Sequence, residues 1–155
     1  MTSLAGARGE RLAEGLAGSW RLRSWTSTFE DGSTAQPFGP APEGVLVYVP
    51  DGTMITTIGQ PDRPRITGGD LVSGPEAEIA AMARSFVAYS GRWSIDGGDV
   101  LHDVSMSLFP DWVGTQQRRH VALSDDGREL TLTSDRFVLR GRLGTQRLVW
   151  SRIEG

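Results

Sequence analysis

Two side chains in this sequence are best suited to chemistry, His102 and Arg119. An imidazole can move a proton near neutral pH, and a guanidinium can hold a carboxylate, enolate or phenolate oxygen. The 16 basic residues are all arginine, so no lysine is present to form a Schiff base. We therefore take His102 and Arg119 as the candidate catalytic pair.

Strand alternation predicts that both side chains point inward. Side chains two residues apart lie on the same face of a strand. His102 shares its face with four apolar residues, Val100, Val104, Met106 and Leu108. Arg119 lies on the more apolar face of its segment, with Gln117, Val121 and Leu123, whereas His120 faces away. We expect His102 and Arg119 to meet on neighbouring inward faces around one lumen.

Two interpretations of this pair remain open. Burial lowers the pKa of a histidine, so His102 would be a neutral general base while Arg119 contacts the ligand. Equally, both side chains are structural polar groups, hydrogen-bonded to each other, to Gln117 or to a trapped water. The sequence does not decide between them.

Aromatic and soft side chains supply the candidate ligand-binding residues. Residues that line a pocket and residues that fill a core look the same in sequence. Met54 favours the core, as Phe86 and Trp93 do. The polar tips of the two tyrosines and of Trp112 need partners, which a ligand could provide. The candidate binding set is Tyr48, Met54, Tyr89, Trp112 and Gln117.

Several other kinds of site lack their residues. A metal site is not expected, because the chain has no cysteine and its two histidines should face opposite sides of their strands. No serine lies in a Gly-x-Ser-x-Gly elbow, and the carboxylates concentrate in turns. No glycine-rich loop opens a helix after a strand, so no nucleotide cofactor is expected.

Turn signals divide the chain into short runs rich in β-branched and aromatic residues. Tight hairpin turns are predicted at 31–32, 50–52, 96–99 and 125–127, where Asp and Gly recur. Many strands joined by short hairpins favour an antiparallel barrel or sandwich. The expected strands are Trp20–Phe29, Val45–Pro50, Thr53–Ile58, Gly91–Ile95, Asp99–Leu108, Gln117–Leu123, Glu129–Thr133, Phe137–Arg142 and Gln146–Arg152.

Two helices are expected beside the strands. Glu10–Ala17 is predicted to form a short helix that ends at Gly18. A second helix is predicted over Pro75–Ala88, since Ser73 and Glu76 have capping-box spacing and an apolar face follows, made of Ile79, Met82, Ala83 and Phe86. The stretch Gly59–Gly74 is polar and rich in Gly and Pro, so we expect a mobile loop near the barrel mouth.

Motifs along most of the chain resemble the bacterial and fungal lipocalin-like domain family, a calycin-type barrel. The resemblance begins with Gly18-x-Trp20 and ends with Trp150-x-Arg152. Between them lie Asp31-Gly32, Pro37-Phe38-Gly39, Gly44 to Tyr48, Asp51 to Met54, Phe86-x-x-Tyr89-Ser90-Gly91-Arg92-Trp93, His102, Pro110 to Gln116 and Arg119. The chain departs from the pattern at Asp103, where a second histidine is expected, so a role that needs a histidine pair is in doubt.

The resemblance implies an all-β fold, a closed antiparallel barrel with a short N-terminal helix and one flanking helix. It also implies that Arg152 covers the indole of Trp20 at the closed end. Several relatives resemble small cyclases, isomerases or accessory proteins of secondary-metabolite pathways, including antibiotic biosynthesis.

Length and composition limit the remaining possibilities. We expect residues 1–155 to form one domain, with 1–8 flexible. A net charge of −3 without a basic stripe argues against nucleic acid, and no apolar run is long enough to span a membrane. No signal peptide is recognised and cysteine is absent, which favours the cytoplasm.

Two functions follow from these observations. The first is a cofactor-independent cyclase, isomerase or dehydratase that acts on a small hydrophobic, polyketide-like intermediate in the lumen. The second is a binding protein that shields such a ligand without changing it. A third, weaker possibility is an accessory subunit of a partner enzyme. An exposed strand could also pair two copies into a homodimer.

Overall fold

The computed structural model describes residues 4–70 and 72–155, and these form a strand-rich fold with two α-helices. The helices are α1 (Leu4–Leu16) and α2 (Glu76–Arg84), and Pro110–Trp112 form a 3-10 turn. The strands are β1 (Gly18–Phe29), β2 (Thr34–Ala35), β3 (Glu43–Tyr48), β4 (Thr53–Gly59), β5 (Phe86–Asp96), β6 (Asp99–Ser107), β7 (Gln116–Leu123), β8 (Glu129–Ser134), β9 (Phe137–Leu139) and β10 (Arg142–Arg152).

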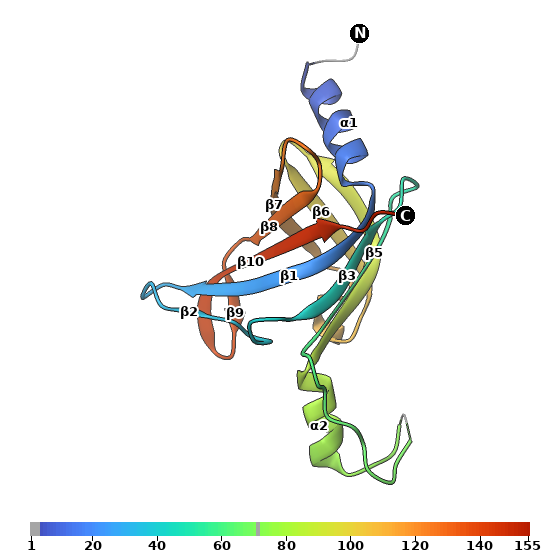
Figure 1. Ribbon diagram of the computed structural model, residues 1–155, viewed down its shortest axis with the longest axis vertical. Coiled ribbons are helices and arrows are strands. Elements are labelled where there is room, and N and C mark those ends of the chain that lie inside the picture. The colour runs from blue at the N-terminus through green and yellow to red at the C-terminus, as the bar shows by residue number, and fades with distance from the viewer. Residues whose placement is uncertain (1–3, 71) are drawn as a thin grey trace.

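The strands close into an antiparallel barrel. Neighbours follow the order β1, β3, β4, β5, β6, β7, β8 and β10, and β10 pairs again with β1. The short strands β2 and β9 extend β1 and β10 at one end (Figure 1). Closure leaves no long exposed edge, and alternate side chains fill the interior. The expected lipocalin-like, all-β barrel is confirmed.

Helix α1 and the start of β1 close one end of the barrel. Leu16 and Trp20 are fully buried, and the Trp20 indole Nε1 donates a 2.9 Å hydrogen bond to the Leu16 carbonyl. Trp20 pairs with Arg152 across β1 and β10, and the Arg152 guanidinium carbon lies 4.2 Å from the Trp20 ring centroid. The predicted stack at the closed end is confirmed.

A β-bulge between β5 and β6 breaks the alternation that the sequence indicates. Ser90 pairs with Met106 but Gly91 pairs with Val104, so β6 carries one extra residue. Before the bulge His102 and Val104 point inward as predicted. Beyond it the expectation is wrong, because Met106 and Leu108 are 71% and 47% exposed.

The predicted second helix is wrong at its C-terminal end. It ends at Arg84, and Phe86 already pairs with Gly59 as the first residue of β5, so β5 begins five residues before the expected Gly91. Pairing with β4 outweighs the helical spacing of Phe86, which is itself a good strand former. The N-cap is Pro75, without a side-chain hydrogen bond, so the predicted capping box of Ser73 does not form.

Two further boundaries differ from expectation. The segment expected as one strand over 137–142 is split by a turn in which Arg140 and Gly141 have φ of 52° and 74°. Helix α1 begins at Leu4 rather than Glu10, and residues 1–3 of the segment expected to be flexible lie outside the described residues. The loop after β4 leads to α2 at the end away from α1 (Figure 1), and residue 71 is also not described.

Candidate functional site

The barrel encloses one large cavity of about 750 Å³, lined by residues from every strand except β2. Cavities of 300–1,000 Å³ are typical of small-molecule sites. Its apolar lining includes Trp25, Leu46, Ile58, Leu132 and Leu148. The polar lining includes His102, Gln117 and Arg119, the residues that alternation predicted to face inward.

His102 lies between two tyrosines. Its Nε2 is 2.7 Å from the Tyr48 hydroxyl, and its Nδ1 is 2.8 Å from the Tyr89 hydroxyl. The imidazole is 1% exposed. Burial, with a smaller effect from the charge of Arg119, holds the pKa of His102 well below its usual value. The imidazole is therefore neutral at physiological pH.

The same burial keeps both tyrosines protonated. Burial raises the pKa of Tyr48 well above its usual value, and the nearby Tyr89 adds to that rise. Burial also raises the pKa of Tyr89, although the positive charge of Arg119 opposes the change. The three rings thus form a neutral chain of hydrogen bonds beside one cation.

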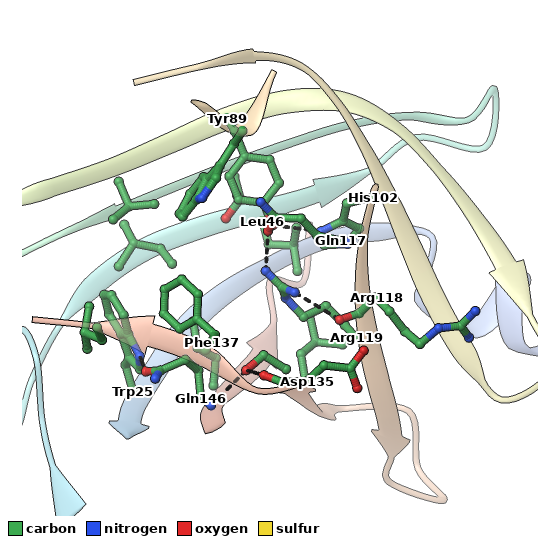
Figure 2. Close-up of a pocket in the computed structure, with 18 of the residues that line it drawn as sticks. Trp25, Leu46, Tyr89, His102, Gln117, Arg118, Arg119, Asp135, Phe137 and Gln146 are labelled. Atoms are coloured by element: carbon green, nitrogen blue, oxygen red, sulfur yellow. Dashed lines mark hydrogen bonds between the residues drawn. The ribbon is translucent and has the colours of Figure 1, made fainter. Parts of the chain in front are cut away.

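Arg119 supplies that cation. On neighbouring strands Val100 pairs with Arg119 and His102 pairs with Gln117, which brings the predicted pair to one region of the lumen. Arg119 Nη2 donates to Gln117 Oε1 at 2.5 Å, and Nη1 donates to the Arg118 carbonyl at 3.0 Å. Within the described part of the chain, no carboxylate forms an ion pair with Arg119. Figure 2 shows its side chain between Tyr89 and Phe137.

The predicted binding residues divide into two groups. Tyr89, Trp112 and Gln117 line the cavity. Tyr48 and Met54 do not, since both are fully buried in the core. Tyr48 instead contacts His102 from behind the cavity wall, and its ring lies 4.9 Å from that of Trp93. Alternation indicates which side chains point inward, but not how deep they lie along the barrel axis.

Aromatic rings form one wall of the cavity. The ring of Trp112 lies edge-on to Tyr89, with centroids 5.8 Å apart, and edge-on to Phe109 at 5.5 Å. Phe137 lies 6.4 Å from Trp112 and also lines the cavity. Such rings suit a flat aromatic ligand.

The sequence analysis missed a polar cluster around Gln146. Its Oε1 accepts hydrogen bonds from Trp25 Nε1 at 2.7 Å and from Ser27 Oγ at 2.5 Å. Among the described residues, three buried polar atoms lack a hydrogen-bond partner, and all belong to residues that line the cavity: Thr56 Oγ1, Gln146 Nε2 and Trp150 Nε1. The signal that could have identified Gln146 is its alternation with Leu148 and Trp150, which places this polar residue on the inward face of its strand.

His120 lies apart from the pair, as the alternation indicates. Its Nδ1 is 3.0 Å from Asp99 and its Nε2 is 2.7 Å from Asp135. The hydrogen bond to Asp135, followed by the one to Asp99, raises the pKa of His120. In residues 4–70 and 72–155, no cluster of three or more candidate ligands could hold a metal ion. Over the same residues, no helix is long and apolar enough to cross a membrane.

Comparison with known proteins places the chain in a family. A 4'-hydroxy-3'-methoxypropiophenone carrier protein of Aspergillus oryzae is 32% identical over 108 residues, which cover 64% of this chain and 96% of that protein. The match to a solved structure, EF1p2_mFAP2b bound to DFHBI, covers 94% of this chain and 99% of that chain at 13% identity, with a TM-score of 0.46. Residues 17–153, from just before β1 to just after β10, match the lipocalin-like domain. The chain therefore belongs to the lipocalin-like domain family.

Proposed function

We propose that the barrel binds a small aromatic compound and holds a phenolate or carbonyl oxygen of that compound against Arg119. The observation that carries this proposal is a cation in a mostly apolar cavity that forms no ion pair with any carboxylate of the described residues. A guanidinium taken out of water is costly unless it is paired. The partners of Arg119 are the Arg118 carbonyl, Gln117 and Tyr89, which are all neutral and satisfy only part of its five N–H groups. An anionic or strongly polar ligand oxygen would complete the site.

The cavity walls favour an aromatic body for this ligand. Trp112, Tyr89 and Phe137 present ring edges and faces along one side, and Trp25 and Leu148 line another part of the cavity. Stacked or edge-on rings contribute about 0.5–1.5 kcal/mol each beyond the apolar area they bury. The ring would supply affinity, and Arg119 would fix its orientation.

The relative in Aspergillus oryzae supports this ligand class. Its named ligand, 4'-hydroxy-3'-methoxypropiophenone, combines an aryl ring, a phenol and a ketone. Those are the groups that an aromatic wall and a guanidinium would recognise. It is also named a carrier, so simple binding is the function we favour for this chain.

A second function, cofactor-independent isomerisation or cyclisation of the bound ligand, has one observation in its favour. His102 lines the cavity as a neutral base, and Arg119 lies near enough to lower its pKa. In the tautomer with Nδ1 unprotonated, the imidazole could take up through the Tyr89 hydroxyl a proton removed beside a carbonyl, while Arg119 holds the oxygen of the enolate. Binding alone requires no such proton transfer.

Ligand titration of purified protein tests the proposal. Quenching of tryptophan fluorescence by 4'-hydroxy-3'-methoxypropiophenone should saturate for the wild type. The Arg119→Gln variant should bind at least about tenfold more weakly, as expected for the loss of a charged hydrogen bond. Arg147→Gln, at an exposed position of β10 outside the cavity lining, is the matched control and should bind normally.

Two results would contradict the proposal or shift it toward catalysis. Equal affinity of Arg119→Gln and wild type would remove Arg119 from ligand recognition. Chromatography of the recovered ligand separates the two functions, since a carrier returns it unchanged. Steady conversion by the wild type that is lost in His102→Gln would favour the enzyme.

A further inference from the structure

We propose that the Tyr89 hydroxyl donates its proton into the cavity and, together with Arg119, restricts this part of the site to ligand atoms that only accept hydrogen bonds. This inference rests on the proposed function and adds a second residue that determines specificity. It follows from the direction of the hydrogen bonds through His102, which the burial of Tyr48 determines.

Tyr48 sets the direction of the chain. Its side chain is fully buried, and within the described residues its hydroxyl has one hydrogen-bond partner, His102 Nε2 at 2.7 Å. A buried hydroxyl proton without an acceptor costs about 1–3 kcal/mol. The Tyr48 proton must therefore point at Nε2, and an Nε2 that accepts a hydrogen bond carries no proton.

The proton of His102 then lies on Nδ1. A neutral imidazole carries one N–H, and burial keeps this imidazole neutral. Nδ1 is 2.8 Å from the Tyr89 hydroxyl oxygen, so the N–H donates to that oxygen. In the opposite arrangement Tyr89 donates to Nδ1 and Nε2 donates to Tyr48, which would leave the buried Tyr48 proton without an acceptor among the described residues.

Tyr89 ends the chain at the cavity. Its oxygen accepts from His102, so its own proton is free to donate, and Tyr89 lines the cavity whereas Tyr48 does not. A hydroxyl group whose oxygen accepts a hydrogen bond becomes a stronger donor through its own proton. Arg119, the neighbouring cation, is also a donor only. The nearby acceptor Gln117 Oε1 is already bonded to Arg119, so these two donors select a carbonyl, ether or phenolate oxygen and disfavour an alcohol proton or an amine.

Two measurements test the inference. Nitrogen–proton correlation spectra of 15N-labelled protein without ligand should show the His102 proton on Nδ1, with Nε2 unprotonated. In titrations, Tyr89→Phe should bind 4'-hydroxypropiophenone about tenfold more weakly, as expected for one lost hydrogen bond to a polar ligand oxygen. The same variant should bind propylbenzene, which has no oxygen, as the wild type does.

These measurements separate the possible failures. A proton on Nε2, or full affinity of a folded Tyr89→Phe variant for 4'-hydroxypropiophenone, would overturn the inference while Arg119 could still bind the ligand. If the wild type bound neither probe, the proposed function would fail together with the role of Tyr89 in recognition. In that case, a spectrum without ligand that still shows the His102 proton on Nδ1 would mean that the hydrogen-bond chain is intact and that ligand binding itself has failed.

Discussion

Arg152 at the closed end and Arg119 in the cavity are both half-buried arginines, but their hydrogen bonds differ. The Nε, Nη1 and Nη2 groups of Arg152 donate to the carbonyls of Gly127, Ala17 and Gly15, and its guanidinium lies over the Trp20 ring. Arg119 donates to the Arg118 carbonyl and to two neutral side chains, those of Gln117 and Tyr89. The partners of Arg152 are thus all backbone carbonyls near the closed end, whereas two partners of Arg119 are neutral side chains that line the cavity.

This contrast indicates how to distinguish a structural cation from one that meets a ligand. Both residues occupy inward-facing regions of the same barrel, so burial alone does not separate them. The position of the hydrogen-bond partners does, since only those of Arg119 include side chains that line the cavity. We expect stability to depend on the closed end and affinity to depend on the cavity, with little exchange between the two.

The largest effect is expected at the closed end. Trp20→Ala should destabilise the protein by about 3–5 kcal/mol, because it leaves a cavity beneath α1 and removes the surface on which Arg152 lies. Urea unfolding followed by circular dichroism measures this change. Ligand affinity of the remaining folded protein should be unchanged. Normal stability of this variant would mean that the stack at the closed end contributes little to the fold.

Exchanging the two arginines for glutamine should sharpen the contrast. Arg152→Gln should lower the free energy of unfolding by about 2 kcal/mol, since three partly buried carbonyls lose their donors. Arg119→Gln should leave that free energy within about 0.5 kcal/mol of wild type, because no ion pair is broken. Parallel urea titrations of the two variants check both values. Equal losses would show that Arg119 is a structural residue as well.

A smaller effect, on pH dependence, is expected from His102. Its pKa is lowered by burial, so below about pH 6.5 the unfolded chain binds a proton that the folded protein does not. This contribution to stability is present above the unfolded pKa and is lost as the pH falls, by up to about 1.4 kcal/mol per unit. The pKa of exposed His120 is raised, so its small contribution has the opposite sign.

Unfolding of wild type and His102→Gln between pH 7 and pH 5 isolates this effect. Carboxylates such as Asp99 have lowered pKa values, so their protonation also destabilises the protein on acidification, but it does so equally in both proteins. The wild type should therefore lose more stability than the variant over this range. Equal losses of stability in the two proteins would mean that His102 binds its proton as readily in the folded state as in the unfolded state.

Much of the fold was predictable because its signals are local. The turns at Asp51-Gly52, Gly97-Gly98 and Asp126-Gly127 each connect two paired strands, as their turn chemistry indicates. The end of α2 was not predictable in this way, because Phe86 fits a helical pattern as well as a strand. Its pairing with Gly59 decides the matter, and that contact is not local.

The candidate site was predictable in part for the same reason. Alternation indicated the inward faces of His102, Gln117 and Arg119, which lie in strands that are regular at those positions. It could not indicate that Tyr48 lies behind His102 while Tyr89 lies in front. That difference is one of depth, set by the stagger of β3 against β5 around the barrel. Gln146 was missed because its polar neighbours Thr145 and Arg147 make that part of the strand look like surface, although alternation with Leu148 and Trp150 indicates an inward face.

The bulge opposite Gly91 gives the site a vulnerable position that contributes no side chain to it. A Cβ at residue 91 would lie 1.8 Å from the Asp103 carbonyl oxygen, so any other amino acid must displace the backbone next to His102. In evolutionary terms, a substitution of Gly91 would disturb the polar centre of the lumen, although Gly91 is not among the residues that line the cavity. A lineage could exchange the aromatic wall residue by residue, but it could replace Gly91 only by rebuilding β6.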